Sequence, residues 1–212
     1  MGIEREIKLA LPQDQVEAAL RLFEARAGVA GRAIRLENIY FDTPELALAR
    51  AKSALRLRRT PDGWLQTFKT VGVAQNGLHA RHEWEMPVAG EALEVDKLLH
   101  ECDEAGVSTA LSAAAAMLIP LFRTDFTRTL WTLTHAGTQV EAAVDQGEVI
   151  ADVNGDVNGD TRRAPICEIE LELKDGDEAA LHALADELAK VLPGLKPDDI
   201  SKAQRGYKLR EG

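Results

Sequence analysis

The sequence has few cysteines, no CxxC pair and no long apolar run. Its two cysteines in 212 residues, Cys102 and Cys167, could form one disulfide at most, and we expect two buried thiols in a reducing cytosol instead. No stretch reaches the roughly 18 apolar residues of a membrane helix, and the N-terminus lacks the apolar core of a signal peptide. These absences predict a soluble, cytoplasmic protein with no membrane partner.

Positive charge is also in deficit. The chain has 25 Lys and Arg residues against 35 Asp and Glu residues, which is a formal net charge of −10. A polyanion would meet net repulsion, so this balance argues against non-specific binding to nucleic acid or to a membrane surface. A small anionic substrate is not excluded, because its binding depends on where the bases lie.

Apolar residues make up 45% of the chain, enough for the core of a single domain over residues 1–212, whereas aromatic residues make up only 5%. Alternation with a period of two residues is the commonest pattern, and it predicts strands. The predicted ranges are 2–9, 34–41, 54–59, 64–70, 79–88, 126–133, 139–145 and 166–174. Turn sequences such as TPDG at 60–63 and HAGT at 135–138 join neighbouring ranges into hairpins.

Three segments have helical spacing instead. A stripe of Val16, Leu20 and Phe23 predicts a helix that stops at Gly28. Residues 90–119 are rich in Ala, Leu and Glu, with a predicted break near Gly106, and residues 177–192 are amphipathic. Helices spliced between antiparallel strands predict an α+β fold, and the pattern leaves open whether the sheet is closed.

One internal repeat occurs, DVNGDVNG at 152–159. Its acids and amides, together with Asp160, are spaced as in a calcium loop. However, no glutamate stands where a twelve-residue loop would end in one. We therefore interpret the stretch as a flexible hairpin extension rather than a metal site.

Several strands carry charge on one face and apolar side chains on the other. In EREIKL, Glu4, Glu6 and Lys8 share a parity, and CEIELELK places three glutamates on one face. ALRLRR places Arg56 and Arg58 side by side in the same way. Any one such face is more often solvated. Taken together they are harder to explain, because like charges along one strand repel one another unless opposite charges compensate for them.

A sheet curled with its charged faces inward would bring these acids and bases together. The acids would then bind a divalent metal ion, and the bases would bind a highly charged anion. The apolar faces would point outward, where amphipathic helices could cover them. Because burying so much charge is costly without partners, we expect the interior to be wet when empty and to be balanced by metal and ligand.

The strand EREIK resembles the ExExK signature of the CYTH domain, the domain of the triphosphate tunnel metalloenzymes. The resemblance continues in order through YFDTPELALARAKSALRLRR, DGWLQTFKT, RHEWEMP, VDQGEV, ICEIELELK and SKAQRGY, from about Ile3 to Tyr207. It implies an eight-stranded antiparallel β-barrel tunnel with helices packed on the outside. It further implies a linear triphosphate as ligand, Mg2+ or Mn2+ as metal, and similarity to the bacterial inorganic triphosphatase branch.

The resemblance also implies roles for individual residues. The expected catalytic residues are Glu4, Glu6, Lys8 and Glu170. The expected metal ligands are Glu4, Glu6, Glu83, Glu85, Asp145, Glu168, Glu170 and Glu172. The expected phosphate-binding residues are Lys8, Arg56, Arg58, Lys69, Arg81, Arg128, Lys202 and Arg205. Arg128 is preferred to Arg123 because FTRTLW keeps the Arg-to-Trp spacing of the family, and His79 and His82 are read as core or surface residues.

The first function that the resemblance implies is hydrolysis of tripolyphosphate to pyrophosphate and phosphate. Class IV adenylate cyclase and thiamine triphosphatase are alternatives within the same fold, although three Trp and two Tyr offer no clear adenine or thiazolium pocket. A non-enzymatic alternative is a polyphosphate-binding module, since such domains often precede a CHAD domain, which here is either absent or removed. The sequence leaves open whether the protein forms a homodimer.

Overall fold

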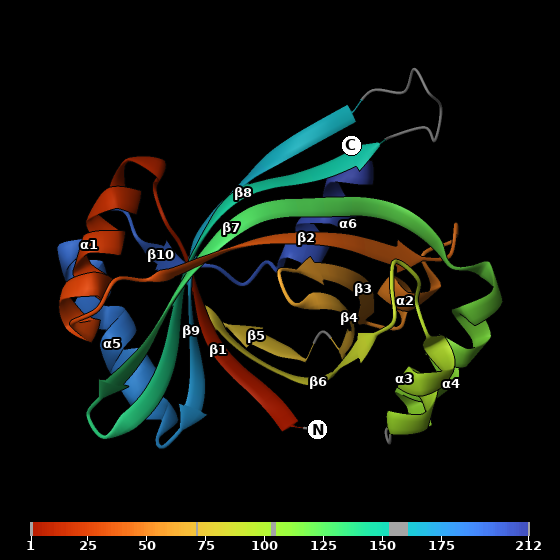
Figure 1. Cartoon of the computed structure of the whole chain (residues 1–212), viewed down its shortest axis with the longest axis horizontal. Coiled ribbons are helices and arrows are strands. Elements are labelled where there is room, and N and C mark those ends of the chain that lie inside the picture. Colours follow the sequence, from red (N-terminus) through yellow and green to blue (C-terminus); the bar gives the residue numbers. More distant parts are fainter. Residues whose placement is uncertain (1, 71, 103–104, 153–160, 212) are drawn as a thin grey trace.

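The described strands form a single antiparallel sheet in the computed structural model (Figure 1). The structure describes residues 2–70, 72–102, 105–152 and 161–211. In chain order the strands are β1 (Gly2–Ala10), β2 (Arg32–Asp42), β3 (Ser53–Thr60), β4 (Gly63–Thr70), β5 (Val73–Gln75), β6 (Leu78–Val88), β7 (Ile119–His135), β8 (Thr138–Asp152), β9 (Thr161–Asp175) and β10 (Lys196–Pro197).

Strand β1 closes this sheet into a barrel, because it pairs with β9 and also with β6. Eight strands form the ring in the order β1-β9-β8-β7-β2-β3-β4-β6, and neighbouring strands are antiparallel. The predicted eight-stranded antiparallel barrel is therefore confirmed. The short strands β5 and β10 were not predicted; β5 pairs with β6, and β10 pairs with β1.

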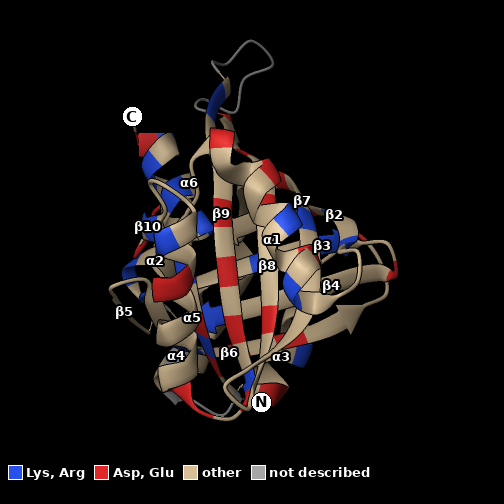
Figure 2. Ribbon diagram, turned by 90° about the vertical axis from the view of Figure 1, so that its left-hand side faces the viewer, with Lys and Arg blue, Asp and Glu red and all other residues tan. Residues whose placement is uncertain are grey.

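The hairpin of β8 and β9 is longer than the sequence pattern predicts. β8 has 15 residues and β9 has 15, and their pairing continues to Asp152 and Thr161. The rest of the DVNGDVNG repeat, at 153–159, and Asp160 lie outside the described residues, so the predicted hairpin extension remains a prediction. In Figure 2, acidic residues recur along β9 at intervals, as expected for one face of a strand.

The helices lie between the strands along the chain, mostly where the spacing of apolar residues changes from that of a strand to that of a helix. They are the 3-10 turns η1 (Gln13–Gln15) and η2 (Ala115–Met117), and α1 (Val16–Ala27), α2 (Ala47–Arg50), α3 (Val95–Glu101), α4 (Ala105–Ala114), α5 (Glu178–Val191) and α6 (Lys202–Glu211). The break between α3 and α4 falls after Glu101, whereas Gly106 lies inside α4. Helices α2 and α6 were not predicted.

Two helix ends follow the expected chemistry. Gly28 ends α1 in the left-handed region at φ 70°, and its N–H donates to the Glu24 carbonyl at 2.9 Å. Asp177 precedes α5, and its carboxylate accepts a hydrogen bond from the Ala179 N–H at 2.9 Å. Local sequence signals are therefore sufficient to predict where α1 ends and where α5 begins.

The outer faces of the barrel are apolar, and helices cover them on two sides. α1 and α5 pack over β1, β7, β8 and β9, where the rings of Phe23 and Trp131 stack at 5.3 Å. The elements α2, α3 and α4 cover a second cluster over β3, β4 and β6, which includes Leu55, Phe68 and Trp84. With the apolar faces covered in this way, the charged faces of the strands point inward.

Helix α6 is the exception, because it packs against the inner side of the barrel. Ala203 and Tyr207 contact a cluster that includes Phe122 and Phe126 of β7. Phe122 and Phe126 have the same strand parity as the inward-facing Arg128. One part of the interior is therefore apolar, and α6 fills it.

Gly206 allows this close packing. A Cβ at this position would collide with the Phe122 ring. We expect Gly206→Ala to lower the free energy of unfolding by about 1–3 kcal/mol, as overpacking usually does. The measurement is urea unfolding, with Gly90→Ala as the control, because a Cβ at Gly90 would meet nothing within 4 Å. Equal effects of the two substitutions would contradict this account of α6.

Neither cysteine forms a disulfide: Cys102 is buried and Cys167 is half-buried. Their expected state as thiols is thus confirmed, although Cys167 is less buried than expected. In the part of the chain that the structure describes, no helix is long and apolar enough to cross a membrane.

Candidate active site

Cross-strand register places acids beside bases on one wall of the barrel. Arg128 of β7 lies opposite Asp145 of β8, which lies opposite Glu168 of β9. One pair further along, Lys8 of β1 lies opposite Glu170 of β9. Directly opposed residues in a sheet are within interaction distance, so the register alone brings these charges together.

The opposite wall repeats the pattern with other strands. Glu4 of β1 lies opposite Arg81 of β6, and Lys69 of β4 lies opposite Glu83 of β6. The regular alternation of the strands aims these side chains inward. Both walls therefore combine residues from charged strand faces with Lys69 and Arg128, which were expected only from the family resemblance.

These walls enclose a cavity of about 1690 Å3. The predicted site residues that line it are Glu4, Glu6, Lys8, Arg56, Arg58, Lys69, Arg81, Glu83, Glu85, Arg128, Glu170, Glu172 and Lys202. Asp145 and Glu168 lie behind this lining, at 0% exposure. Arg205 reaches Glu168 from α6. The structure thus brings the whole predicted set to one region.

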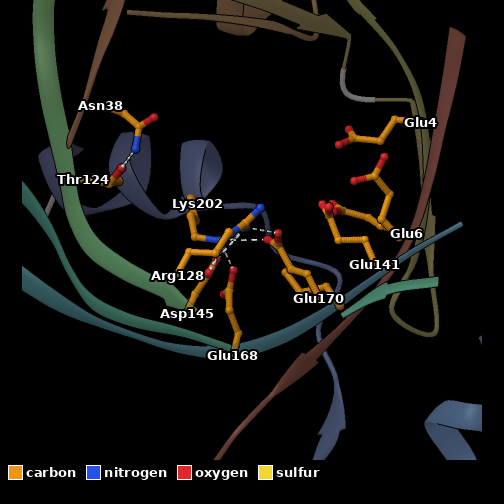
Figure 3. Close-up of polar contacts among 12 residues, drawn as sticks. Glu4, Glu6, Asn38, Thr124, Arg128, Glu141, Asp145, Glu168, Glu170 and Lys202 are labelled. Carbon is orange, nitrogen blue, oxygen red and sulfur yellow. Dashed lines mark hydrogen bonds and ion pairs between the residues drawn. The ribbon is translucent and has the colours of Figure 1, made fainter. Parts of the chain in front are cut away.

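We call Asp145, Glu168 and Glu170 the Asp145 cluster (Figure 3). Lys202 from α6 inserts its ammonium among all three carboxylates, with Nζ 2.6 Å from an Asp145 oxygen and 2.8 Å from a Glu170 oxygen. Arg128 donates two hydrogen bonds to Asp145, at 2.8 and 2.7 Å, and also contacts Glu170. Each carboxylate therefore has a buried cationic partner.

The Asp145 cluster also has the donor set of a metal site. Each of its carboxylates offers one oxygen, and these oxygens lie within 4.8 Å of one another. Such oxygen ligands suit hard divalent cations. Because the ammonium of Lys202 contacts the same oxygens, a metal ion and this lysine would compete for them. The residues present fit a metal ion, provided that Lys202 can change partner.

A second group, Glu4, Glu6 and Glu83, lies on the other wall, and we call it the Glu4 cluster. Lys69 Nζ is 3.1 Å from a Glu4 oxygen and 2.6 Å from a Glu83 oxygen. Arg81 bridges the glutamates of β1, with Nε 2.8 Å from Glu4 and Nη2 bonded to Glu6. Acids and bases are again paired before any ligand binds. Figure 3 shows Glu4, Glu6 and Glu141 on the far side of the space from Lys202.

The two predicted arginines of β3 have different partners. Arg56 Nη2 lies 3.3 Å from Glu85, and Thr67 donates to the same Glu85 oxygen at 2.7 Å. Arg58 instead donates from Nε to the Asn38 amide oxygen at 2.7 Å. Burial, with the neighbouring cations Arg56 and Arg128, lowers the pKa of Arg58 to about 10. Its charge is therefore the less compensated of the two.

Lys8 resembles Arg58 in this respect. The residue is only 2% exposed, and its ammonium donates to the backbone carbonyl of Ile200. Burial lowers the pKa of Lys8, although the Glu168 carboxylate acts in the opposite direction. Lys8 and Arg58 thus have neutral hydrogen-bond partners, and an anion could be bound there without breaking an ion pair.

The two signature glutamates differ in their ionisation. Burial alone would raise the pKa of Glu4, but Lys69 and Arg81 outweigh it and hold that pKa well below its usual range. Burial, together with the neighbouring Glu170 carboxylate, raises the pKa of Glu6 to about 7. Glu6 is therefore the weaker acid of the pair in the absence of ligands.

This difference predicts a pH effect on stability. A folded-state pKa raised from 4.5 to about 7 means that Glu6 stabilises the fold below pH 4.5, and that this contribution is lost as the pH rises toward 7. Metal-free Glu6→Gln stays neutral. From pH 4.5 to 7.5 we expect it to gain roughly 1–3 kcal/mol relative to the original protein. Urea unfolding at both pH values measures this, and a constant difference would contradict the raised pKa.

Sequence reasoning missed the neutral polar residues of the interior. The Asn38 amide, buried beside Arg58, donates to Thr124 at 2.8 Å, and Thr67 holds Glu85. The sequence pattern that could have indicated them is a neutral polar residue at an inward-facing position of a strand. Asp198, which pairs with Arg205 at 3.0 Å, had no such signal because it lies in a loop.

Two further predictions concern the choice of Arg128 over Arg123 and the reading of His79. Arg123 is exposed, whereas Arg128 lines the cavity, in agreement with the choice of Arg128. His79 is buried, as expected for a core histidine, with its Nε2 2.9 Å from the Asp198 carbonyl, but it also borders the cavity. Burial lowers the pKa of His79.

Comparison with known proteins gives a family and a relative. The CYTH domain profile matches residues 2–207. An inorganic triphosphatase from Haemophilus influenzae (strain ATCC 51907 / DSM 11121 / KW20 / Rd) is 32% identical over 210 residues, which cover 97% of this chain and 54% of that protein. The chain thus spans about half the length of the curated relative that it matches.

Solved structures share the fold at low sequence identity. A candidate adenylyl cyclase from Hippeastrum, reported to have a dominant triphosphatase activity, superposes with a TM-score of 0.64 and 18% identity, covering 97% of this chain and 95% of that one. A candidate adenylate cyclase from Bacillus halodurans has a TM-score of 0.57 and 17% identity, covering 96% of each chain. At these identities the likeness concerns the fold.

Proposed function

Since this chain belongs to the CYTH domain family, as its sequence resemblance indicated, we propose that it hydrolyses inorganic triphosphate to pyrophosphate and phosphate. The observation that carries the proposal is the composition of the cavity wall. Seven of the predicted cations and six of the predicted carboxylates line the same cavity. A small polyanion that binds together with divalent cations is the ligand that such a wall suits best.

Recognition of the triphosphate would be electrostatic. Arginines offer forked donors to non-bridging phosphate oxygens, and lysines offer compact charge. Lys8 and Arg58 would engage first, because their present partners are neutral oxygens. Arg56, Lys69, Arg81, Arg128 and Lys202 would have to exchange a carboxylate for a phosphate.

The carboxylates would hold the metal, for which we propose Mg2+ or Mn2+. Glu4, Glu6 and Glu170 are the proposed principal ligands, and Glu83, Glu85, Asp145, Glu168 and Glu172 are the proposed supporting ones. When bound, the metal neutralises phosphate charge and lowers the pKa of a coordinated water. The chain's own cations would meanwhile hold the phosphates in line for attack.

The two exchanges are coupled. A triphosphate that draws Lys202 and Arg128 away leaves the Asp145 cluster without its cations. Metal binding to those carboxylates would restore the balance, and the reverse order works equally well. Metal and triphosphate are therefore expected to strengthen each other's binding by the same factor.

The remaining proposals rest on composition and on the family. We infer that residues 1–212 act as one CYTH domain in the cytoplasm and that nucleic acid is not a partner, because the net charge is −10. Adenylate cyclase, thiamine triphosphatase and a polyphosphate-binding module are the competing functions.

One experiment separates these functions. The protein is incubated with tripolyphosphate, ATP, thiamine triphosphate or long-chain polyphosphate, in Mg2+, in Mn2+ or in chelator, and phosphate, pyrophosphate and cyclic AMP are assayed. We expect equimolar phosphate and pyrophosphate from tripolyphosphate, and only with metal. Cyclic AMP from ATP would support the cyclase instead, faster phosphate release from thiamine triphosphate than from tripolyphosphate would support thiamine triphosphatase, and binding without turnover would support the module.

A further inference from the structure

Asp42, at the end of β2, is a buried carboxylate that belongs to neither acidic cluster. It is 0% exposed. One of its oxygens accepts hydrogen bonds from the N–H groups of Thr43 at 2.7 Å and Leu48 at 2.8 Å, and the other accepts from Ala49 at 2.9 Å. Because buried charge is costly unless it is hydrogen-bonded, these donors make Asp42 a rigid acceptor at the start of α2.

Tyr207 of α6 provides a further donor. Its hydroxyl lies 3.0 Å from Asp42 Oδ2, across 165 residues of sequence. Its ring packs edge-on against Phe122 at 5.1 Å, and Phe122 stacks on Tyr40 at 4.7 Å. Burial and the Asp42 carboxylate raise the pKa of Tyr207, so the hydroxyl keeps its proton and donates.

Helix α6 is thus held at two points. At its first residue, Lys202 contacts the Asp145 cluster, and five residues later Tyr207 contacts Asp42. Both α2 and α6 line the cavity, through Ala49 and Ala203 among other residues. The hydrogen bond between Tyr207 and Asp42 therefore ties together two walls of the same cavity.

The two anchors differ in what ligands do to them. Lys202 would exchange its carboxylate partners for phosphate when triphosphate binds, and metal would compete for the same oxygens. Asp42 and Tyr207 are spared this exchange, because Asp42 is fully buried and is already bonded to backbone N–H groups. This second anchor is the one that can stay constant during turnover.

We propose that Asp42 and Tyr207 are positioning residues for the reaction in this cavity: their hydrogen bond holds α6 in place while Lys202 changes from carboxylate to phosphate. The inference rests on the proposed function, and it adds two residues that are not among the proposed phosphate-binding residues or metal ligands. Without the hydrogen bond, α6 would keep its apolar contacts with β7 but would have more freedom at the moment when Lys202 is released.

The test is Tyr207→Phe, which removes only the hydroxyl and keeps the ring against Phe122. We expect the Kd for tripolyphosphate, measured by calorimetry in metal-free buffer, to rise roughly tenfold, because binding must then also order α6 once Lys202 has left its carboxylates. KM should rise by a similar factor, whereas kcat should change by less than twofold. The reason is that the variant disorders a substrate-binding group, Lys202, and leaves the reacting groups in place.

Thr138→Val is the matched control. It also removes one buried hydroxyl, which accepts a hydrogen bond from the Asp177 N–H at 3.0 Å at the start of α5. Helix α5 lies on the outer face of the barrel. We expect a comparable loss of stability in this variant, with the Kd for tripolyphosphate unchanged.

Two readouts separate positioning from general loosening. Amide hydrogen exchange of α6 should be faster in Tyr207→Phe than in the original protein or in Thr138→Val. In addition, the effect of Tyr207→Phe on Kd should disappear when Lys202→Met is already present, because the anchor acts through that lysine. If Lys202→Met does not fold, the exchange and Kd measurements decide.

The outcomes also separate the two proposals. Unchanged exchange in α6, or an unchanged Kd in Tyr207→Phe, would overturn the positioning role. Absence of any tripolyphosphate binding by the original protein would overturn the proposed function, and with it the role of this anchor in the reaction. Faster exchange with weaker binding, confined to Tyr207→Phe, supports the inference.

Discussion

Replacing Glu170 by glutamine is expected to lower kcat/KM for tripolyphosphate by at least about 100-fold. The substitution keeps the shape of the side chain and removes one negative charge from the centre of the site. Glu170 is expected both as a catalytic residue and as a metal ligand. It belongs to the Asp145 cluster, and its charge also helps to raise the pKa of Glu6.

The loss should come mainly through the metal. An amide is a poorer ligand than a carboxylate for a hard divalent cation, so Mg2+ binding measured by calorimetry should weaken in parallel. Arg128 and Lys202, which hold the pKa of Glu170 well below its usual range against the effect of burial, would also lose a partner. They would become freer to bind phosphate, so substrate affinity without metal should not fall.

Glu148→Gln is the control for this substitution. Glu148 also forms an ion pair with an arginine, Arg163, but this pair is partly exposed and lies outside the cavity lining. We expect its activity to stay within twofold of the original protein. Full activity of Glu170→Gln at saturating Mg2+ would refute the assignment of Glu170 as a metal ligand.

Replacing Lys202 by methionine is expected to have the second large effect, this time on stability. Methionine preserves much of the length and leaves Asp145, Glu168 and Glu170 without the ammonium that contacts all three. Removing one partner of a buried ion pair typically costs about 3–5 kcal/mol. We expect a loss of this size in urea unfolding at pH 7 without metal.

Added Mg2+ should reverse part of that loss. The three carboxylate oxygens lie within 4.8 Å of one another and would no longer be occupied by a competing cation. A ligand that binds only the folded state stabilises it in proportion to its affinity. The rise in Tm with Mg2+ should therefore be larger in Lys202→Met than in the original protein, even though substrate binding is weaker.

Lys190→Met, on the exposed side of α5, serves as the control and should change neither stability nor the response to Mg2+. A Lys202→Met variant as stable as the original protein would show that the buried carboxylates are compensated by other groups. An equal rise in Tm with Mg2+ in the variant and in the original protein would contradict the competition between Lys202 and metal.

The strands and the charges of the site could be predicted from local patterns. Alternation in EREIK and CEIELELK puts Glu4, Glu6 and Glu170 on definite faces, since the side-chain period of a strand is two residues. The charges on those faces predicted an inward orientation, because outward apolar faces leave the helices something to cover. The structure has this arrangement, with α1 and α5 over the outer faces.

The path of α6 could not be predicted in the same way. The segment that contains Lys202 and Tyr207 has little apolar periodicity, and its buried positions are a lysine and a glycine. Those residues are buried because Asp145 and Phe122, far away in the chain, provide the charge and the surface that they need. Local propensity has no access to such partners.

From the amino-acid sequence alone, the strand faces and their charges followed from residue identity and a period of two, whereas the family and its expected site residues followed from the resemblance of motifs such as EREIK. Only folding in three dimensions settled which polar side chains meet: Lys202 among the Asp145 cluster, Arg58 with Asn38, and Tyr207 with Asp42. Those pairings depend on barrel closure and on the packing of α6, and both bring together segments that are distant in the chain.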